Sequence, residues 1–173
     1  QHARACELVV AHNPAKDDDG ERIGERLVME CGRPVMLVPA GDAPATLGTD
    51  VTVAWNATRE SARALFDALP LLRGAKMVHL VWIDPQVGVG EEASRAADAV
   101  AAALAHAGVT CEAVTGSAQS GTVGDEILGR VADYGSDLLV MGGYGHSRFR
   151  QLVFGGVTRH VLAEMKVPVL MSH

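Results

Sequence analysis

Aromatic residues and cysteines are scarce in this chain of 173 residues. Phe, Trp and Tyr make up 4% of it, while hydrophobic residues make up 48%, so a core has to be built mainly from aliphatic side chains. Such a composition favours helices packed on buried parallel strands, whose covered faces select Val, Leu and Ile. The cysteines Cys6, Cys31 and Cys111 form no Cys-x-x-Cys pair, so we expect no disulfide framework, no metal site and a cytoplasmic protein.

Long apolar runs and clustered positive charge are also missing. No stretch reaches the run of about 18 apolar residues that a membrane-spanning helix needs, so we expect no association with a membrane. The formal net charge is -6, whereas nucleic-acid-binding proteins present Lys and Arg side chains that displace counterions from phosphates. We therefore expect no nucleic-acid partner.

Strand and helix patterns alternate over the second part of the chain. Short apolar runs predict strands, and apolar residues at helical spacing behind capping residues such as Thr58 and Thr122 predict helices. The expected strands span 51–55, 77–83, 110–115, 137–141 and 167–171, and the expected helices lie within 58–74, 91–106, 122–131 and 157–165. This alternation predicts an α/β fold for residues 47–173, a doubly wound, Rossmann-like parallel five-stranded sheet of strand order 3-2-1-4-5.

The beginning of the chain repeats the end of that domain. Residues 7–10 (ELVV) resemble 137–140 (DLLV), and 32–39 (GRPVMLVP) resemble 166–172 (KVPVLMS). We interpret residues 1–46 as a partial βαβ half-domain, the fourth strand, helix and fifth strand of a degenerate first copy. Its first strand would have an open edge, and ordinary domain sizes predict roughly a hundred further residues ahead of it. Coincidence between βαβ units of similar apolar pattern is the alternative.

The most informative segment is the loop between the fourth strand and the fourth helix of the predicted domain. Gly142 and Gly145 bracket a tight turn after the strand, and Gly155 and Gly156 precede the helix. Glycines let the backbone approach a phosphate, and a helix N-terminus adds N–H donors and a positive dipole. No Asp or Glu occurs in 138–163, which favours an anion locally. Ligands of doubly wound sheets bind outside the carboxyl ends of the strands where the strand order reverses.

These glycines carry a family resemblance. The spacing Gly142-x-x-Gly145-x9-Gly155 resembles the ATP-binding signature of universal stress proteins. The stretch 53–65 (VAWNATRESARAL) resembles the first strand and helix of that family, and 167–170 (VPVL) resembles its last strand. The resemblance covers the predicted domain throughout, and the repeat at the beginning of the chain is similar to tandem members with two such domains. It implies a stress-response module that binds ATP, with or without Mg²⁺.

The resemblance also implies where the nucleotide lies: the phosphates against the glycines and the helix start, the adenosine near strands one and two. The residues so assigned are Val53, Ala54, Trp55, Asn56, Val81, Met141, Gly142, Gly145, His146, Gly155, Gly156, Val157 and Thr158. Two departures weaken binding. Gly156 stands where the signature has Ser or Thr, a loss of about 1 kcal/mol for one hydrogen bond. Asn56 stands where the family often has Asp, and its amide accepts a hydrogen bond from ribose but brings no charge toward a metal.

No catalytic residues are predicted. The sequence contains no G-x-S-x-G elbow, no H-E-x-x-H and no P-loop, so at most slow ATP hydrolysis is expected. The loop 11–22 of the first copy contains three consecutive aspartates, whose charges repel phosphate, and we expect no nucleotide there.

Two other functions stay open. One is a nucleotide-free dimerisation module, in which the two copies of strand five, Pro34–Pro39 and Val167–Ser172, pair antiparallel. The pairing would form either a homodimer or an intramolecular pseudo-dimer, and the resemblance supports it because the family's dimers usually meet in this way. The other is a weak ATP hydrolase on the same fold.

Overall fold

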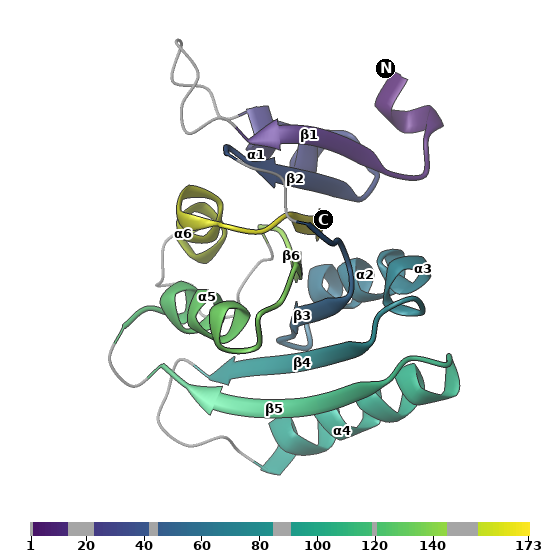
Figure 1. Cartoon of the computed structure of the whole chain (residues 1–173), viewed down its shortest axis with the longest axis vertical. Helices are drawn as coiled ribbons and strands as arrows, with labels where there is room; N and C mark the ends of the chain where they lie inside the picture. The colour runs from purple at the N-terminus through teal and green to yellow at the C-terminus, as the bar shows by residue number, and fades with distance from the viewer. Residues whose placement is uncertain (1, 14–22, 42–44, 85–90, 119–120, 145–155) are drawn as a thin grey trace.

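The computed structural model describes the chain except for residues 1, 14–22, 42–44, 85–90, 119–120 and 145–155. Its strands are β1 Val9–Asn13, β2 Val35–Pro39, β3 Asp50–Ala54, β4 Met77–Asp84, β5 Cys111–Ser117, β6 Leu138–Gly142 and β7 Val169–Ser172. They form one seven-stranded sheet of order β1-β2-β7-β6-β3-β4-β5 (Figure 1). The strands β3, β4, β5, β6 and β7 are the first to fifth strands of the predicted domain. Across the sheet they follow one another as β5-β4-β3-β6-β7, which is the predicted order 3-2-1-4-5. All neighbours pair parallel except β2 and β7.

The helices follow the predicted positions with one correction. Their bounds are η1 His2–Ala5 (a 3-10 helix), α1 Ile23–Glu30, α2 Arg59–Asp67, α3 Leu69–Leu72, α4 Glu91–His106, α5 Val123–Asp133 and α6 Gly156–Glu164. The single helix expected within 58–74 is two helices that share Ala68 as a cap. Pro70 explains the break, because proline lacks the N–H of a continuous helix and its ring collides with the preceding turn. No described helix is long and apolar enough to cross a membrane.

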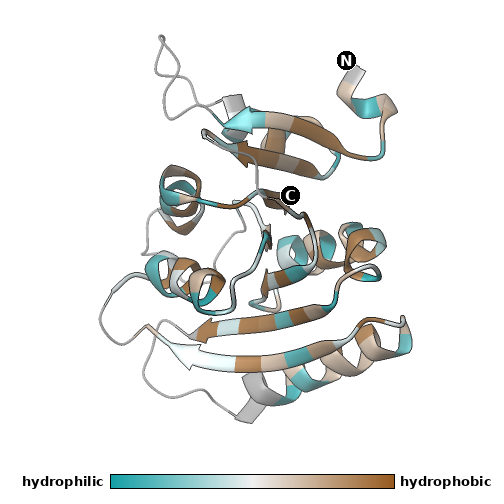
Figure 2. Ribbon diagram, in the orientation of Figure 1, coloured by the Kyte–Doolittle hydropathy of each residue, from teal (hydrophilic) through white to brown (hydrophobic). Residues whose placement is uncertain are grey.

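Helices cover both faces of the sheet, and each face has its own apolar core (Figures 1 and 2). Val51 and Val53 of β3 lie in the core under α2, α3 and α4, together with Leu65 and Leu72. Residues from α1, α5 and α6 form the core of the opposite face, against which Ala54 packs. Successive strand residues point to opposite faces, so the aliphatic runs of the sequence supply both cores.

The predicted antiparallel pairing of Pro34–Pro39 with Val167–Ser172 is confirmed in its intramolecular form. The two strands pair with Val35 opposite Met171 and Leu37 opposite Val169. The strands β1 and β2 therefore extend the predicted five-stranded sheet to seven strands. Because β2 lies between β1 and β7, and β7 lies between β2 and β6, neither strand has an open edge left for a second chain.

Helix α5 begins with the predicted capping box. The Thr122 hydroxyl oxygen accepts a hydrogen bond from the Asp125 N–H at 3.1 Å, and the Asp125 carboxylate accepts from the Thr122 N–H and hydroxyl, each at 2.8 Å. His160 of α6 lies 2.7 Å from the same carboxylate. The hydrogen bonds from Thr122 and the charge of His160 hold the pKa of Asp125 below its ordinary value.

The stability of the wild-type protein is expected to fall more steeply at acid pH than that of the Asp125→Asn variant. A carboxylate whose pKa is lowered by folding stabilises the native state above its unfolded pKa of about 3.9, and loses this contribution as pH falls through the folded value. Urea unfolding of both proteins at about pH 5 and about pH 3 measures the difference. Identical pH dependence in the two proteins would contradict the role given to this carboxylate.

Candidate functional site

The carboxyl ends of β3 and β6 meet at the point where the strand order reverses. Ala54 at the end of β3 pairs with Val81 of β4 on one side and with Met141 of β6 on the other. These three predicted site residues therefore form one row across neighbouring strands. The structure brings the predicted adenosine-contacting and phosphate-contacting segments to the same end of the sheet, which we call the mouth.

Two of the predicted adenosine residues are turned into the core. Val53 and Trp55 belong to the apolar cluster under α2, α3 and α4, and Trp55 is only 8% exposed. The backbone N–H of Trp55 donates to the Val81 carbonyl at 2.8 Å, which continues the sheet by one residue beyond β3. Among the described residues, the buried indole Nε1 of Trp55 has no hydrogen-bond partner. The side chain of Trp55 is thus a donor that the described protein does not satisfy.

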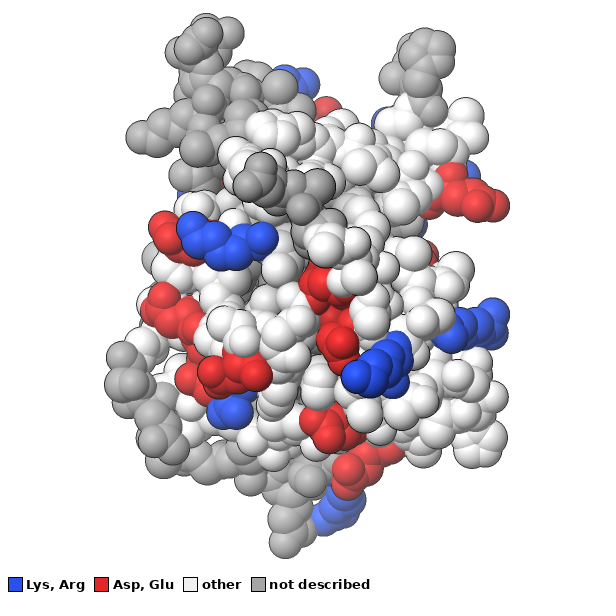
Figure 3. Space-filling model, in the orientation of Figure 1, with Lys and Arg blue, Asp and Glu red and all other residues white. Residues whose placement is uncertain are grey.

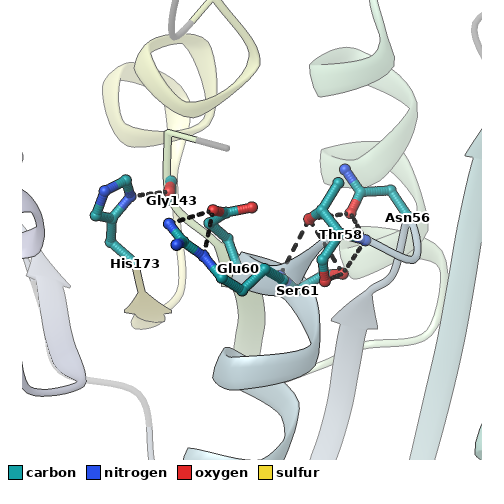
Figure 4. Close-up of polar contacts among 7 residues, drawn as sticks. Asn56, Thr58, Glu60, Ser61, Gly143 and His173 are labelled. Atoms are coloured by element: carbon teal, nitrogen blue, oxygen red, sulfur yellow. Dashed lines mark hydrogen bonds and ion pairs between the residues drawn. The ribbon is translucent and has the colours of Figure 1, made fainter. Parts of the chain in front are cut away.

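The loop after β3 holds Asn56 in a local turn (Figure 4). The Asn56 side-chain oxygen accepts from the Thr58 hydroxyl at 2.8 Å and from the Thr58 N–H at 3.3 Å. Thr58 in turn caps α2. The oxygen expected to accept a hydrogen bond from ribose is already engaged, so the amide nitrogen of Asn56 is the group left to face a ligand.

Close packing of helices explains Gly142, the last residue of β6, and Gly143, which follows it. A Cβ on Gly142 would lie 2.6 Å from the backbone of Glu60 and Ser61 at the start of α2, and a Cβ on Gly143 would lie 2.7 Å from the Val28 side chain of α1. Contacts below 3.0 Å to backbone require the helix to move. Gly142 was predicted to face a phosphate, and its packing against α2 is a second reason for glycine that no sequence pattern indicated.

Two N–H groups of this turn are bonded within the protein. Gly143 donates to the Ser172 carbonyl at 2.9 Å, and Tyr144 donates to the Thr158 hydroxyl at 3.4 Å. Tyr144 has φ 53° and Ala57, in the loop after β3, has φ 54°; they are the non-glycine residues with positive φ among those described. Such conformations cost about 1–3 kcal/mol each and cluster at functional sites. Both flank the mouth.

The first turn of α6 supplies the remaining described part of the predicted phosphate site. Gly156 and Val157 are exposed, and Thr158 is buried. A Cβ on Gly156 would meet no atom of the described residues within 4 Å, and the first turn of α6 contains no acidic residue. The predicted residues Gly145, His146 and Gly155 lie outside the described residues.

Residues 138–163 contain no Asp or Glu, but acidic residues from distant parts of the chain lie close to this segment. Acidic and basic side chains occur together over α5 and α6 in Figure 3. Glu25 lies 3.5 Å from Arg159, Asp125 contacts His160, and Glu60 lies under Gly142. Each of the first two is paired with a basic side chain of α6, which reduces the negative field. The region is therefore less favourable to anions than its local composition indicated.

Glu60 and His173 are mouth residues that the sequence analysis missed (Figure 4). His173 Nδ1 lies 3.0 Å from the Gly143 carbonyl. Glu60 is buried and forms an ion pair with Arg59 at 3.0 Å. Burial raises the pKa of Glu60, but hydrogen bonds from its own backbone and from Arg59, with the charges of Arg59 and His173, outweigh burial and hold that pKa below its usual value.

Comparison with known families assigns this arrangement. The Universal stress protein family matches residues 51–173, which contain β3 to β7 and the whole mouth. The chain belongs to the universal stress protein family. Over 38 residues, 22% of this chain, it is 53% identical to the universal stress protein Slr1230 of Synechocystis, and this match spans 13% of that relative.

Solved structures share the fold of this universal stress protein. A universal stress protein from Archaeoglobus fulgidus matches 95% of this chain with a TM-score of 0.73 and 16% identity. The protein MJ0577 matches 72% of this chain and 94% of its own length, with a TM-score of 0.61 and 18% identity. The chain spans 59% of the Archaeoglobus protein's length. The matches confirm the predicted α/β fold, and their identities limit the similarity to the fold.

One signal could have located His173 beforehand. Parallel pairing of the fourth and fifth strands was predicted, and it brings their carboxyl ends to one edge of the sheet; the structure sets the register, with Gly142 opposite Ser172. The residue after Ser172 then reaches the turn after β6 in any protein with this register. Glu60 carried no such signal, because its position follows from how closely α2 approaches Gly142.

Proposed function

We propose that this universal stress protein binds an adenine nucleotide, ATP, at the mouth, and acts as a stress-response module through binding rather than catalysis. The observation that carries the proposal is the open first turn of α6 beside the carboxyl ends of β3 and β6. The first N–H groups of a helix have no intrahelical partner and carry positive partial charge. They suit the phosphates of a nucleotide.

The described residues fit such a ligand at both of its ends. Gly156 lacks a side chain, and no atom of the described residues would lie within 4 Å of a Cβ there, so a phosphate can approach the backbone of α6 closely. The amide nitrogen of Asn56 offers a donor at the end of β3, because the side-chain oxygen of Asn56 is held by Thr58. Among the described residues, no group of three or more His, Cys, Asp or Glu is placed to hold a metal ion. Any Mg²⁺ would therefore bind mainly through the phosphates.

Titration of ATP into the purified protein tests the proposal. A dissociation constant near micromolar should raise the free energy of unfolding by about 2–4 kcal/mol at millimolar ATP. Urea unfolding with and without ATP measures the increase, and fluorescence of Trp55 in a Trp82→Phe background locates the bound ligand. No increase would favour the nucleotide-free interaction module. Steady phosphate release above background would favour a weak ATP hydrolase.

Replacing Gly156 by serine is expected to tighten ATP binding about fivefold, because one added hydrogen bond contributes about 1 kcal/mol. Within the described part of the chain the substitution meets no obstacle, since a Cβ at this position has no atom of those residues within 4 Å. Isothermal titration calorimetry measures the change, and Gly129→Ser on α5, where a Cβ is equally free, is the control. Unchanged affinity in Gly156→Ser would show that this position does not face the phosphates.

A further inference from the structure

The N-terminal strands and the C-terminal strands are related by a pseudo-two-fold axis. Met36 of β2 pairs with Leu170 of β7, the equivalent position. Val35 pairs with Met171 and Leu37 pairs with Val169, so exchanging the two strands gives the same set of pairs. Hydrogen bonds repeat in the same way: Val9 donates to the Pro34 carbonyl, and Leu139 donates to the Pro168 carbonyl, each at 3.0 Å. The strand pairs β1–β2 and β6–β7 thus have the same register, residue by residue. Val10 is the counterpart of Val140.

The two counterparts have opposite surroundings. Val140 is 0% exposed, pairs with Val53 of β3 and lies in the core under α2. Val10 is 62% exposed, and β1 is the last strand of the sheet on its side. The complete unit therefore needs two additional elements, a strand beside β1 and a helix over the face that carries Val10.

The free hydrogen-bonding edge of β1 also indicates a missing neighbouring strand. Bonds in a parallel ladder alternate along a strand, so a strand whose Val9 N–H faces β2 turns the N–H groups of Val10 and His12 outward. An outward row of N–H and C=O groups on an apolar strand is a template for another strand.

We propose that residues 1–46 are the C-terminal part of a first universal stress domain of the same polypeptide, whose first strand pairs parallel with β1 and whose first helix covers Val10. These two elements are the counterparts of β3 and α2. A second copy of the chain does not fit as well: its β3 is already paired on both sides, and edge-to-edge pairing of two β1 strands adds no helix over Val10.

The covering helix approaches β1 less closely than α2 approaches β6. His12 is the counterpart of Gly142, and a side chain there occupies the space that α2 uses at the mouth. The first domain therefore differs from the second at its own mouth.

The test compares the chain of residues 1–173 with the protein made from its complete natural coding sequence. We expect the Val10 and His12 amides to exchange with solvent at least about 100-fold more slowly in the complete protein, because pairing adds the protection of a central strand. Residue-resolved hydrogen exchange by NMR measures this. Equal exchange in the two proteins, or a natural protein that starts at Gln1, would overturn the proposal. Protection in the 1–173 chain that rises with its concentration would also overturn it, in favour of self-association.

A substitution distinguishes docking from other effects of a longer chain. Val10→Lys is expected to lower the urea midpoint of the complete protein and to leave that of the 1–173 chain nearly unchanged. Met29→Lys on α1 is the matched control, because Met29 is 46% exposed and its counterpart Ala163 is exposed in the complete unit. Equal effects of Val10→Lys in both proteins would contradict coverage of this face.

Discussion

Replacing Gly156 by aspartate is expected to remove the stabilisation that ATP provides, a loss of about 2–4 kcal/mol at millimolar nucleotide. The new carboxylate would stand at the open first turn of α6, within a few ångströms of where the phosphates are proposed to lie. Like charges at this distance repel strongly, and the penalty grows when water is displaced from between them. Urea unfolding with and without ATP gives the size of the loss.

The nucleotide-free protein should tolerate this aspartate. A Cβ on Gly156 meets no atom within 4 Å among the residues that the structure describes, and a negative charge in the first turn of a helix interacts favourably with the helix dipole. The unfolding midpoint without ATP is therefore expected to stay the same or rise slightly. This behaviour separates loss of binding from loss of folding.

Gly156→Asn is the matched control, because it adds nearly the same volume without the charge. We expect it to retain ATP-dependent stabilisation. If asparagine and aspartate abolish the effect equally, the cause is steric. If neither substitution changes the stabilisation by ATP, the first turn of α6 does not hold the phosphates, and the main observation behind the proposed function is wrong.

Replacing Gly142 by alanine is expected to destabilise the protein by about 3 kcal/mol, the upper part of the range for overpacked cores. The added Cβ would lie 2.6 Å from backbone atoms of Glu60 and Ser61. A flexible side chain could turn away, but the start of α2 is backbone held by the Thr58 capping box. The whole helix must move, and it covers the apolar core under β3 and β6. Urea unfolding with an unchanged m-value measures the cost.

Gly129→Ala makes the same chemical change as Gly142→Ala but is expected to stabilise the protein rather than destabilise it. Gly129 lies in the interior of α5, and a Cβ there meets no atom within 4 Å. Alanine favours a helix over glycine by up to about 1 kcal/mol, so this variant should be more stable than the wild type. Wild-type stability in Gly142→Ala would mean that α2 does not approach β6 as closely as the structure shows.

Gly142 and Gly156 belong to the same glycine-rich segment but are expected to have different functions, helix packing and phosphate binding. Gly142 is required where a helix crosses the end of a strand, whereas a Cβ on Gly156, at a helix start, would contact none of the described residues. A motif match assigns both to the ligand. Only the first should carry a large cost in stability, and only the second should lose binding through charge alone.

Local patterns in the sequence determined the elements of this protein. Alternating aliphatic runs, the capping boxes of Thr58 and Thr122 and the glycine spacing after β6 each act within a few residues, so they could be interpreted without coordinates. The repeat between the beginning and end of the chain also predicted the antiparallel pairing of β2 with β7. The break at Pro70 had a local cause as well, and its consequence for α2 and α3 could have been anticipated.

Tertiary structure decided what surrounds the mouth. Glu25, Glu60 and Asp125 approach a segment that has no acidic residue of its own, and the Asn56 oxygen turns to Thr58 instead of a ligand. Val10 and Val140 occupy equivalent positions in similar sequences, yet one is exposed and the other is fully buried. Burial, charge and hydrogen-bond partners depend on residues far apart in the chain, whereas helix and strand periodicity depends on neighbours.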